Sequence, residues 1–258
     1  MKKAFIFGLL VVFLVVFSLV AFAQKPQEIP LPDKAGIYDV PGRPDLKLRV
    51  FLHPDKPAKS GKPTPTTPPY TCTETDPDSL LPVDLAGWKL PNSWIVKLNV
   101  SSVPSTVGGS HLLAIVDNAF REWLTRISNK VTVIYTGTTN VSRANLDGQN
   151  IITWGNAPAS ALAVSYIWYN GDGYAVEVDT IMNKKYTWYW SQDINCAYQN
   201  VYDAQDILTH ELGHTFGLDD MYTNDYANHT MYGYGSKGEV KKDTLTPGDI
   251  TSVQNIYK

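Results

Sequence analysis

The chain has 258 residues, 43% of them hydrophobic and 12% aromatic, with a formal net charge of -3 at pH 7. This composition is typical of a packed globular protein of one large or two small domains, and it excludes an intrinsically disordered chain. The near balance of charge gives no indication of a nucleic-acid partner or of attraction to an anionic membrane surface.

The N-terminus has the organisation of a secretory signal peptide. Met1-Lys2-Lys3 is basic, residues 4–20 are nearly all apolar, and Ala21-Phe22-Ala23 offers the small residues that precede a cleavage site. We predict that residues 1–23 are removed and that the protein is secreted, with no stable membrane partner afterwards. A retained anchor is the alternative, because the apolar run approaches the roughly 20 residues that span a bilayer.

Residues 24–87 are rich in proline, lysine, aspartate and threonine and are predicted to be a pro-region or linker of uncertain order. The prolines of residues 61–69 exclude a helix or a central strand there. Residues 46–52 could form one short strand. We expect continuous order to begin near Trp88.

From Trp88 onward, hydrophobic periodicity predicts alternating strands and helices. A strand is expected at 94–100, and an amphipathic helix follows, with Leu112, Val116, Ala119, Phe120, Trp123 and Ile127 at helical spacing. Further strands are expected at 131–135, 150–154, 162–169 and 174–179. A helix should begin near Asp203, and a last one at Thr246, where Pro247 and Asp249 complete the start signal. This order predicts an α/β or α+β domain over residues 88–258.

Residues 210–220 read His-Glu-Leu-Gly-His-Thr-Phe-Gly-Leu-Asp-Asp. His210 and His214 are one helical turn apart, so both imidazoles can reach one metal ion from the same helix face. Gly217 permits the chain to turn out of the helix, and Asp220 can then return as a third ligand. Glu211 is adjacent to the first histidine and is predicted to be the general base that acts on a metal-activated water.

The third ligand has two alternatives in the sequence. Asp219 is adjacent to Asp220 and could replace it, and His229 lies further along the chain. Two imidazoles and one carboxylate leave a fourth tetrahedral position open, which favours a catalytic zinc ion. Ligand types alone leave iron or another divalent ion open.

These residues resemble the metzincin signature HExxHxxGxxH/D. Thr230-Met231-Tyr232-Gly233 is similar to the Met-turn beneath the metal in that clan, and Tyr232 after the methionine resembles the matrixin type. Residues 244–257 are similar to the closing helix of matrixin catalytic domains. The resemblance implies an α+β domain with a twisted, mostly parallel sheet, an antiparallel edge strand, an active-site helix, a Met-turn and a C-terminal helix.

The chain also departs from the matrixin pattern. Asp220 stands where matrixins generally have histidine, and an aspartate at this position resembles some bacterial metzincins such as the snapalysins. The loop that holds a second, structural zinc in animal matrixins is absent. Cys72 and Cys196 are expected to form a disulfide in an oxidising compartment. The alternative, a Cys72 thiolate that blocks the zinc, is weakened because its surroundings do not match the family's cysteine-switch motif. A carboxylate such as Asp76 or Asp78 could cap the zinc instead.

The resemblance further implies that an extended peptide pairs with the edge strand, for which residues 162–169 are the candidate. The aromatic side chains Tyr166, Trp168 and Tyr169 would line that cleft or pack in the core. Residues 221–240 should wall the pocket for the residue after the scissile bond. Asp172, Glu177 and Asp179 could hold a structural calcium ion (Ca²⁺), although a solvated acidic turn is the simpler reading.

The sequence therefore predicts a monomeric, secreted zinc (Zn²⁺) metalloendopeptidase, made as a zymogen, whose partner is a protein or peptide substrate. The alternatives are a catalytically silent module that binds peptide or cell wall, and a hydrolase of a non-protein amide. The intact Glu211 argues against the silent module.

Overall fold

The computed structural model describes residues 30–56, 69–72 and 79–258. The predicted signal peptide and the two candidate zinc-capping carboxylates, Asp76 and Asp78, lie outside these residues. Within the described part of the chain, no helix has the length and apolar character needed to cross a membrane.

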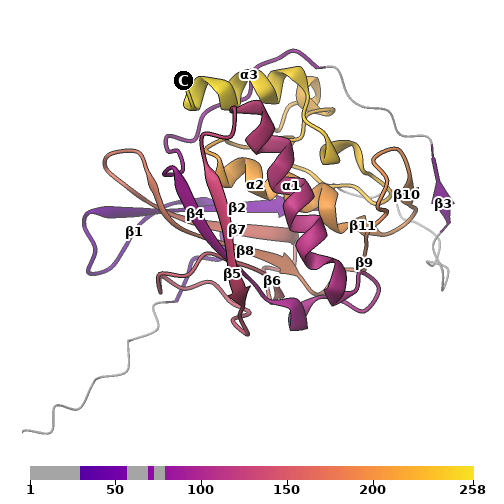
Figure 1. The fold of residues 1–258 in the computed structure, drawn as a ribbon, viewed down its shortest axis with the longest axis horizontal. Helices are drawn as coiled ribbons and strands as arrows, with labels where there is room; N and C mark the ends of the chain where they lie inside the picture. The colour runs from indigo at the N-terminus through magenta and orange to yellow at the C-terminus, as the bar shows by residue number, and fades with distance from the viewer. Residues whose placement is uncertain (1–29, 57–68, 73–78) are drawn as a thin grey trace, which may run out of the picture.

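One seven-stranded sheet organises the fold, in the order β1-β2-β7-β8-β6-β4-β5 (Figure 1). Strands β4, β5, β6 and β8 are mutually parallel, whereas β7 runs antiparallel to β8, and β2 antiparallel to β7. The strand bounds are β1 Gly36–Asp39, β2 Leu46–Pro54, β4 Ser93–Leu98, β5 Thr132–Thr138, β6 Ile151–Gly155, β7 Ala161–Asn170 and β8 Ala175–Asn183.

Three α-helices complete the fold: α1 Leu112–Arg126, α2 Ala204–Thr215 and α3 Pro247–Ile256. Two small sheets pair β3 Tyr70–Thr71 with β10 Ala197–Tyr198, and β9 Trp188–Tyr189 with β11 Tyr202–Asp203. Short 3-10 helices occupy Val100–Ser102 (η1), Gly109–His111 (η2), Asn224–Tyr226 (η3) and Lys241–Asp243 (η4).

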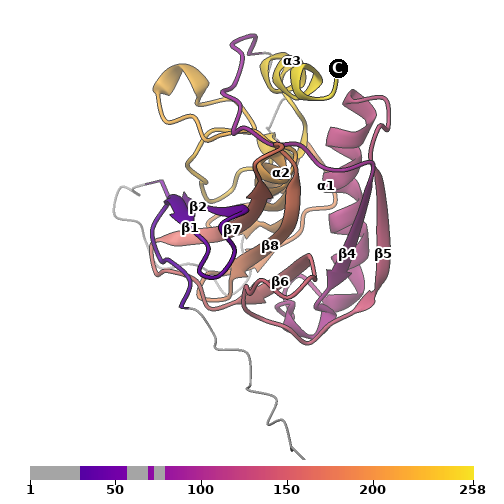
Figure 2. The same cartoon turned by 90° about the vertical axis from the view of Figure 1, so that its left-hand side faces the viewer.

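The sheet has a hydrophobic cluster on each face. The larger cluster joins the helices to the sheet and includes Trp123 of α1, Leu212 of α2 and Val253 of α3. The smaller one covers the opposite face and includes Val50 of β2 and Trp168 of β7. Figure 2 shows β1 and β2 at one edge of the sheet and β5 at the other. The expected α+β architecture with a mostly parallel sheet is therefore confirmed.

Order begins well before Trp88, contrary to the expectation from composition. β2 pairs with β7 along its whole length, from Leu46 opposite Asn170 to Pro54 opposite Ala161. Alternate residues of β2 face opposite sides of the sheet, so Leu46, Leu48 and Val50 join the smaller cluster. The short strand predicted at residues 46–52 is therefore confirmed, but local composition did not reveal that it pairs with a segment more than a hundred residues away.

Among the strands after Trp88, β7 forms one edge of the sheet and β5 the other, in agreement with the edge position predicted for residues 162–169. In the full sheet, however, β2 lies along its otherwise open side. The aromatics of β7 pack in the core: Tyr166 and Trp168 belong to the smaller cluster, and Tyr169 packs against Trp88.

The predicted helix starts are confirmed. Asp203 caps α2 by accepting the backbone N–H groups of Gln205 and Asp206, and Thr246 forms a capping box with Asp249 at the start of α3.

Glu177 and Asp179 are buried, so the reading of a solvated acidic turn is wrong for these two residues. Both Glu177 oxygens accept backbone N–H groups, from Asp147 at 2.8 Å and Gly148 at 2.6 Å. Asp179 accepts those of Asn145 and Ile151. The two carboxylates therefore fasten the loop before β6 to β8. Asp172 is exposed in the turn between β7 and β8.

Burial raises the pKa of Glu177 to about 7, from an ordinary value of 4.5. A raised pKa means that protonation favours the folded state, so this contribution is present below pH 4.5 and is lost as the pH rises toward 7. Glu177→Gln should remove that dependence. The free energy of unfolding of the variant should rise relative to the wild type between these pH values, measured by urea denaturation.

Asp172→Asn is the matched control for Glu177→Gln, because its side chain is exposed on the neighbouring turn. It should keep the wild-type pH dependence. A constant difference between wild type and Glu177→Gln across the range would contradict the assignment to Glu177.

Candidate metal centre

Helix α2 contributes His210, Glu211 and His214, and two tryptophans from other parts of the chain bond to its backbone. The indole Nε1 of Trp88 donates to the carbonyl oxygen of His214 at 3.0 Å, and that of Trp123 donates to the carbonyl oxygen of Thr209 at 2.9 Å. All twelve residues of α2 are buried. The helix is therefore held between α1 and the sheet, with little freedom to rotate.

The two imidazole rings are oriented by backbone carbonyls. Nδ1 of His210 donates to the carbonyl oxygen of Thr230 at 2.7 Å, and Nδ1 of His214 donates to that of Leu218 at 2.9 Å. This arrangement assigns the proton to Nδ1 and leaves each Nε2 as a lone-pair donor, the tautomer that a metal ion requires.

Asp220 completes a group of three. Its Oδ1 lies 3.2 Å from Nε2 of His210 and 3.5 Å from Nε2 of His214. Nitrogen and oxygen ligands of tetrahedral zinc, bound at about 2.0–2.2 Å, are separated from one another by about 3.4 Å. The spacing of these three atoms fits such an ion.

The turn that returns Asp220 depends on Gly217. Its φ of 100° lies in the left-handed region, and an added Cβ would approach the carbonyl oxygen of Trp88 to 2.1 Å. The hydroxyl of Tyr222 then donates to Oδ2 of Asp220 at 3.0 Å, which leaves Oδ1 to face the imidazoles.

The structure places the two alternative ligands elsewhere. Asp219 forms an ion pair with Arg49 of β2 at 3.0 Å, and Nε2 of His229 lies 2.8 Å from the carbonyl oxygen of Leu81. Neither belongs to a group of converging metal-ligating atoms in the described part of the chain, whereas His210, His214 and Asp220 form one.

The donor atoms also pass a test of chemical fit. Nε2 of His210, Nε2 of His214 and Oδ1 of Asp220 are buried and have no hydrogen-bond partner. Buried polar atoms are almost always paired, because leaving them unpaired costs free energy. A bound cation would satisfy all three at once.

Glu211 lies beside this group and is fully buried. Its Oε2 accepts a hydrogen bond from the hydroxyl of Ser165 on β7 at 2.5 Å. Oε1 is 3.3 Å from Nδ1 of His53 but lacks hydrogen-bond geometry. Burial raises the pKa of the Glu211 carboxyl to about 8. Ser165 therefore fixes one oxygen of Glu211 and leaves the other, Oε1, without a hydrogen bond.

Met231 supports the helix from below, as the Met-turn resemblance implies. It is fully buried, and a Cβ added to Gly213 would meet its sulfur at 2.1 Å. The carboxylate of Asp249, at the start of α3, accepts the backbone N–H groups of Thr230 at 3.0 Å and Met231 at 3.4 Å. Helix α3 thereby positions the turn whose carbonyl orients His210.

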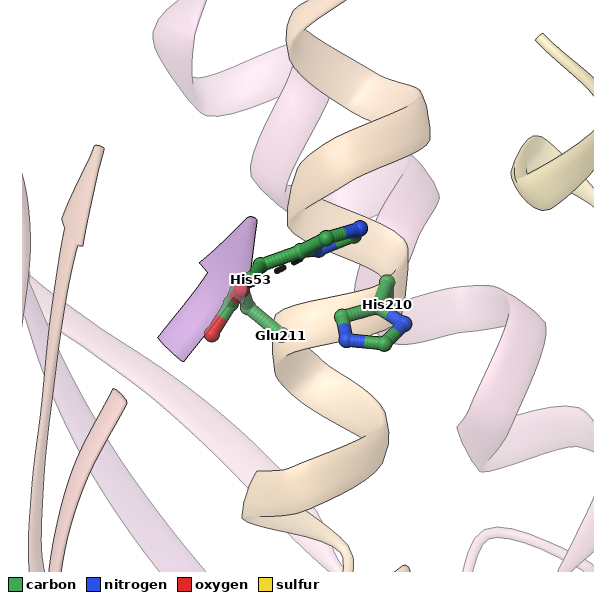
Figure 3. Close-up of side chains that lie close together, drawn as sticks. All are labelled: His53, His210 and Glu211. Carbon is green, nitrogen blue, oxygen red and sulfur yellow. Dashed lines mark ion pairs between the residues drawn. The ribbon is translucent and has the colours of Figure 1, made fainter. Parts of the chain in front are cut away.

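Strand β2 covers the centre. The ring of Phe51 stacks on that of His214, with centroids 3.7 Å apart and planes inclined by 5°. The ring of His53 lies 3.8 Å from that of His210. Figure 3 shows the His53 side chain projecting from the end of β2 toward Glu211 and His210 on α2. Phe51 and His53 lie opposite Ser165 and Ala163 of β7.

Cys72 does not block the centre. It is bonded to Cys196, which confirms the predicted disulfide and excludes the thiolate alternative. Sequence reasoning missed Ser165, His53 and Lys242, whose Nζ lies 3.2 Å from Nε2 of His53, because each reaches the site through tertiary packing. The one available signal was His53 itself, at the end of a segment with strand character.

One comparison with known proteins identifies a family for the chain. The sequence model of one family, described as Matrixin, matches residues 92–258. No curated protein matches the chain. The family match spans the sheet from β4 onward, the metal-ligating group and the closing helix, and it leaves β1 and β2 outside. The chain belongs to the matrixin family of zinc metallopeptidases.

Proposed function

We propose that the chain is a secreted zinc-dependent metalloendopeptidase in which His210, His214 and Asp220 hold the metal and Glu211 is the general base. The observation that carries this proposal is the convergence of three buried, unpartnered donor atoms beside a buried carboxylate. Secretion rests on the signal peptide predicted from residues 1–23.

The zinc, when bound, supplies a Lewis acid that polarises the scissile carbonyl and lowers the pKa of water to about 7. The protein's own residues do the rest. Glu211 accepts the proton of the attacking water at Oε1 and passes it to the leaving amine. Ser165 keeps the carboxylate in place during both transfers, because its hydroxyl occupies Oε2.

We further propose that the protein is made as a zymogen and that β2 keeps it latent. A substrate peptide would add to the open side of β7 as an antiparallel strand. β2 occupies that position over nine residues and covers Glu211 completely. His53, rather than a cysteine or a carboxylate, is then the side chain that lies against the base.

In the mature enzyme, Glu211→Ala should slow peptide-bond hydrolysis while zinc stays bound. General-base catalysis is worth about 10²–10⁴-fold in rate, so we expect a loss of this size against casein or a peptide library. Zinc content is measured on the same sample by elemental analysis. Cleavage at the wild-type rate would contradict the assigned role.

Asp220→Ala should reduce zinc content, because it removes one of three ligands. Asp219→Asn is the matched control: this side chain is adjacent in sequence but pairs with Arg49, and its amide oxygen can still accept the backbone N–H of Asp220, so zinc should be retained. Equal zinc loss in the two variants would show that the third ligand is wrongly assigned. Chelation of wild-type protein should abolish cleavage, and added zinc should restore it.

Removing the two side chains of β2 that face the centre should weaken the pairing of β2 with β7 and raise the activity of the full-length protein. Truncating a buried phenylalanine costs about 3–5 kcal/mol, and Phe51 loses its stack on His214. Full-length Phe51→Ala/His53→Ala should therefore hydrolyse a peptide at least about tenfold faster than full-length wild type. Hydrogen exchange should show faster exchange in β2.

Ile37→Ala is the control for that experiment. Ile37 belongs to β1, next to β2, but is 61% exposed and lies away from the centre. Its variant should keep the wild-type rate. If full-length wild type already cleaves as fast as the double variant while β2 stays protected, the latency proposal is wrong.

A further inference from the structure

The side chain of His53 is fully buried beside the metal-ligating group, and the space that it fills is called the His53 pocket below. β2 runs antiparallel to β7, the direction expected of an added substrate strand. The His53 ring lies against His210 and faces Glu211 (Figure 3). A substrate residue in this position would therefore be next to the bond that the centre attacks.

Lys242, on η4, forms the far end of this pocket. Its side chain is fully buried, and its Nζ donates to the carbonyl oxygens of Tyr232 at 2.6 Å and Tyr234 at 2.9 Å. The third Nζ contact is Nε2 of His53 at 3.2 Å. An ammonium group has three N–H donors. Two of them bond to the carbonyl oxygens of Tyr232 and Tyr234, so the third is left for the side chain that fills the pocket, which here is His53.

The neighbouring carboxylates do not take that donor. Oδ1 of Asp206 accepts the backbone N–H of Lys242 at 2.8 Å, and Glu239 forms its ion pair with Lys241 at 3.0 Å. Within the described residues, no carboxylate oxygen lies within ion-pair distance of the Lys242 ammonium. The carboxylates of Asp206 and Glu239 therefore act on the Lys242 charge only at longer range.

The hydrogen-bond pattern fixes how His53 fits. With Lys242 donating to Nε2, the proton is on Nδ1 and faces Oε1 of Glu211. The occupant thus offers an acceptor at its tip to a buried cation.

We propose that Lys242 is a specificity-determining residue: it selects substrates whose residue after the scissile bond ends in a hydrogen-bond acceptor, such as a carboxamide, carboxylate or imidazole. This inference rests on the proposed peptidase function. An aliphatic residue of the same shape would leave the third donor of a buried ammonium unpaired, whereas an acceptor replaces the contact that His53 makes.

The first test uses full-length protein and needs no catalysis. His53→Gln and His53→Met place side chains of similar shape in the pocket, with and without an acceptor. Hydrogen bonds to charged groups are worth enough for about a tenfold change in an equilibrium. The backbone N–H groups of β2 should exchange about tenfold more slowly in His53→Gln than in His53→Met.

The same pair is then measured in a Lys242→Met background. The preference should disappear or reverse there, because the pocket then ends in an apolar group. Comparing the pair within each background cancels any general loss of stability caused by Lys242→Met. An equal ratio in both backgrounds would overturn the proposal.

The second test uses the mature enzyme recovered from the culture medium. Peptides differ only in the residue after the scissile bond, with asparagine against leucine and glutamine against methionine. We expect kcat/KM to favour the acceptor of each pair about tenfold. Preference for leucine and methionine would overturn the role of Lys242. Absence of all cleavage would instead refute the peptidase function, and the exchange experiment would still decide the pocket's chemistry.

Discussion

Two backbone carbonyls determine the chemistry of this molecule. By accepting Nδ1–H from His210 and His214, the carbonyl oxygens of Thr230 and Leu218 force both Nε2 atoms toward one point. Each carbonyl depends on a further element: Thr230 is tied to α3 through Asp249, and Leu218 follows the left-handed turn at Gly217. The closing helix and the turn after α2 therefore both orient the imidazoles. The helix does so without contributing a ligand.

One side of β7 pairs with β2 in the structure, and under the proposed function a substrate peptide would pair with the same backbone groups. The chain's own β2 is tethered, so it competes with a substrate at the high effective concentration of an intramolecular partner. It also buries Phe51 against the centre. A free peptide can compete only after this strand has left. The same feature of β7 that makes the fold suitable for binding peptides thus makes it suitable for being closed by its own N-terminal segment.

Sequence reasoning recovered what local pattern encodes. The spacing of His210, His214 and Asp220 predicted their convergence, and Thr246 with Asp249 predicted the start of α3. It failed for contacts set by strand pairing and packing. Nothing near His53 or Lys242 indicates that they meet, because 189 residues separate them and only the pairing of β2 with β7 brings them together. Composition misled on where order begins: the strand expected at residues 46–52 is present as β2, but the proline-rich residues after it gave no sign that it belongs to the main sheet.

The disulfide between Cys72 and Cys196 attaches the later part of the segment before Trp88 covalently to the domain, whereas the earlier part, with β1 and β2, has no such bond. The covalent connection from β1 and β2 to Cys72 and the domain after it runs through residues 57–68. Beyond them, Cys72 is bonded covalently, and the carbonyl oxygens of Leu81 and Asp84 pair with His229 and with the backbone N–H of Asp219. A cut within 57–68 would therefore leave β1 and β2 held by noncovalent contacts alone, whereas the new N-terminus would remain fastened to the domain. Under the latency proposed above, β2 could then leave β7 while Leu81 and Asp84 keep their contacts.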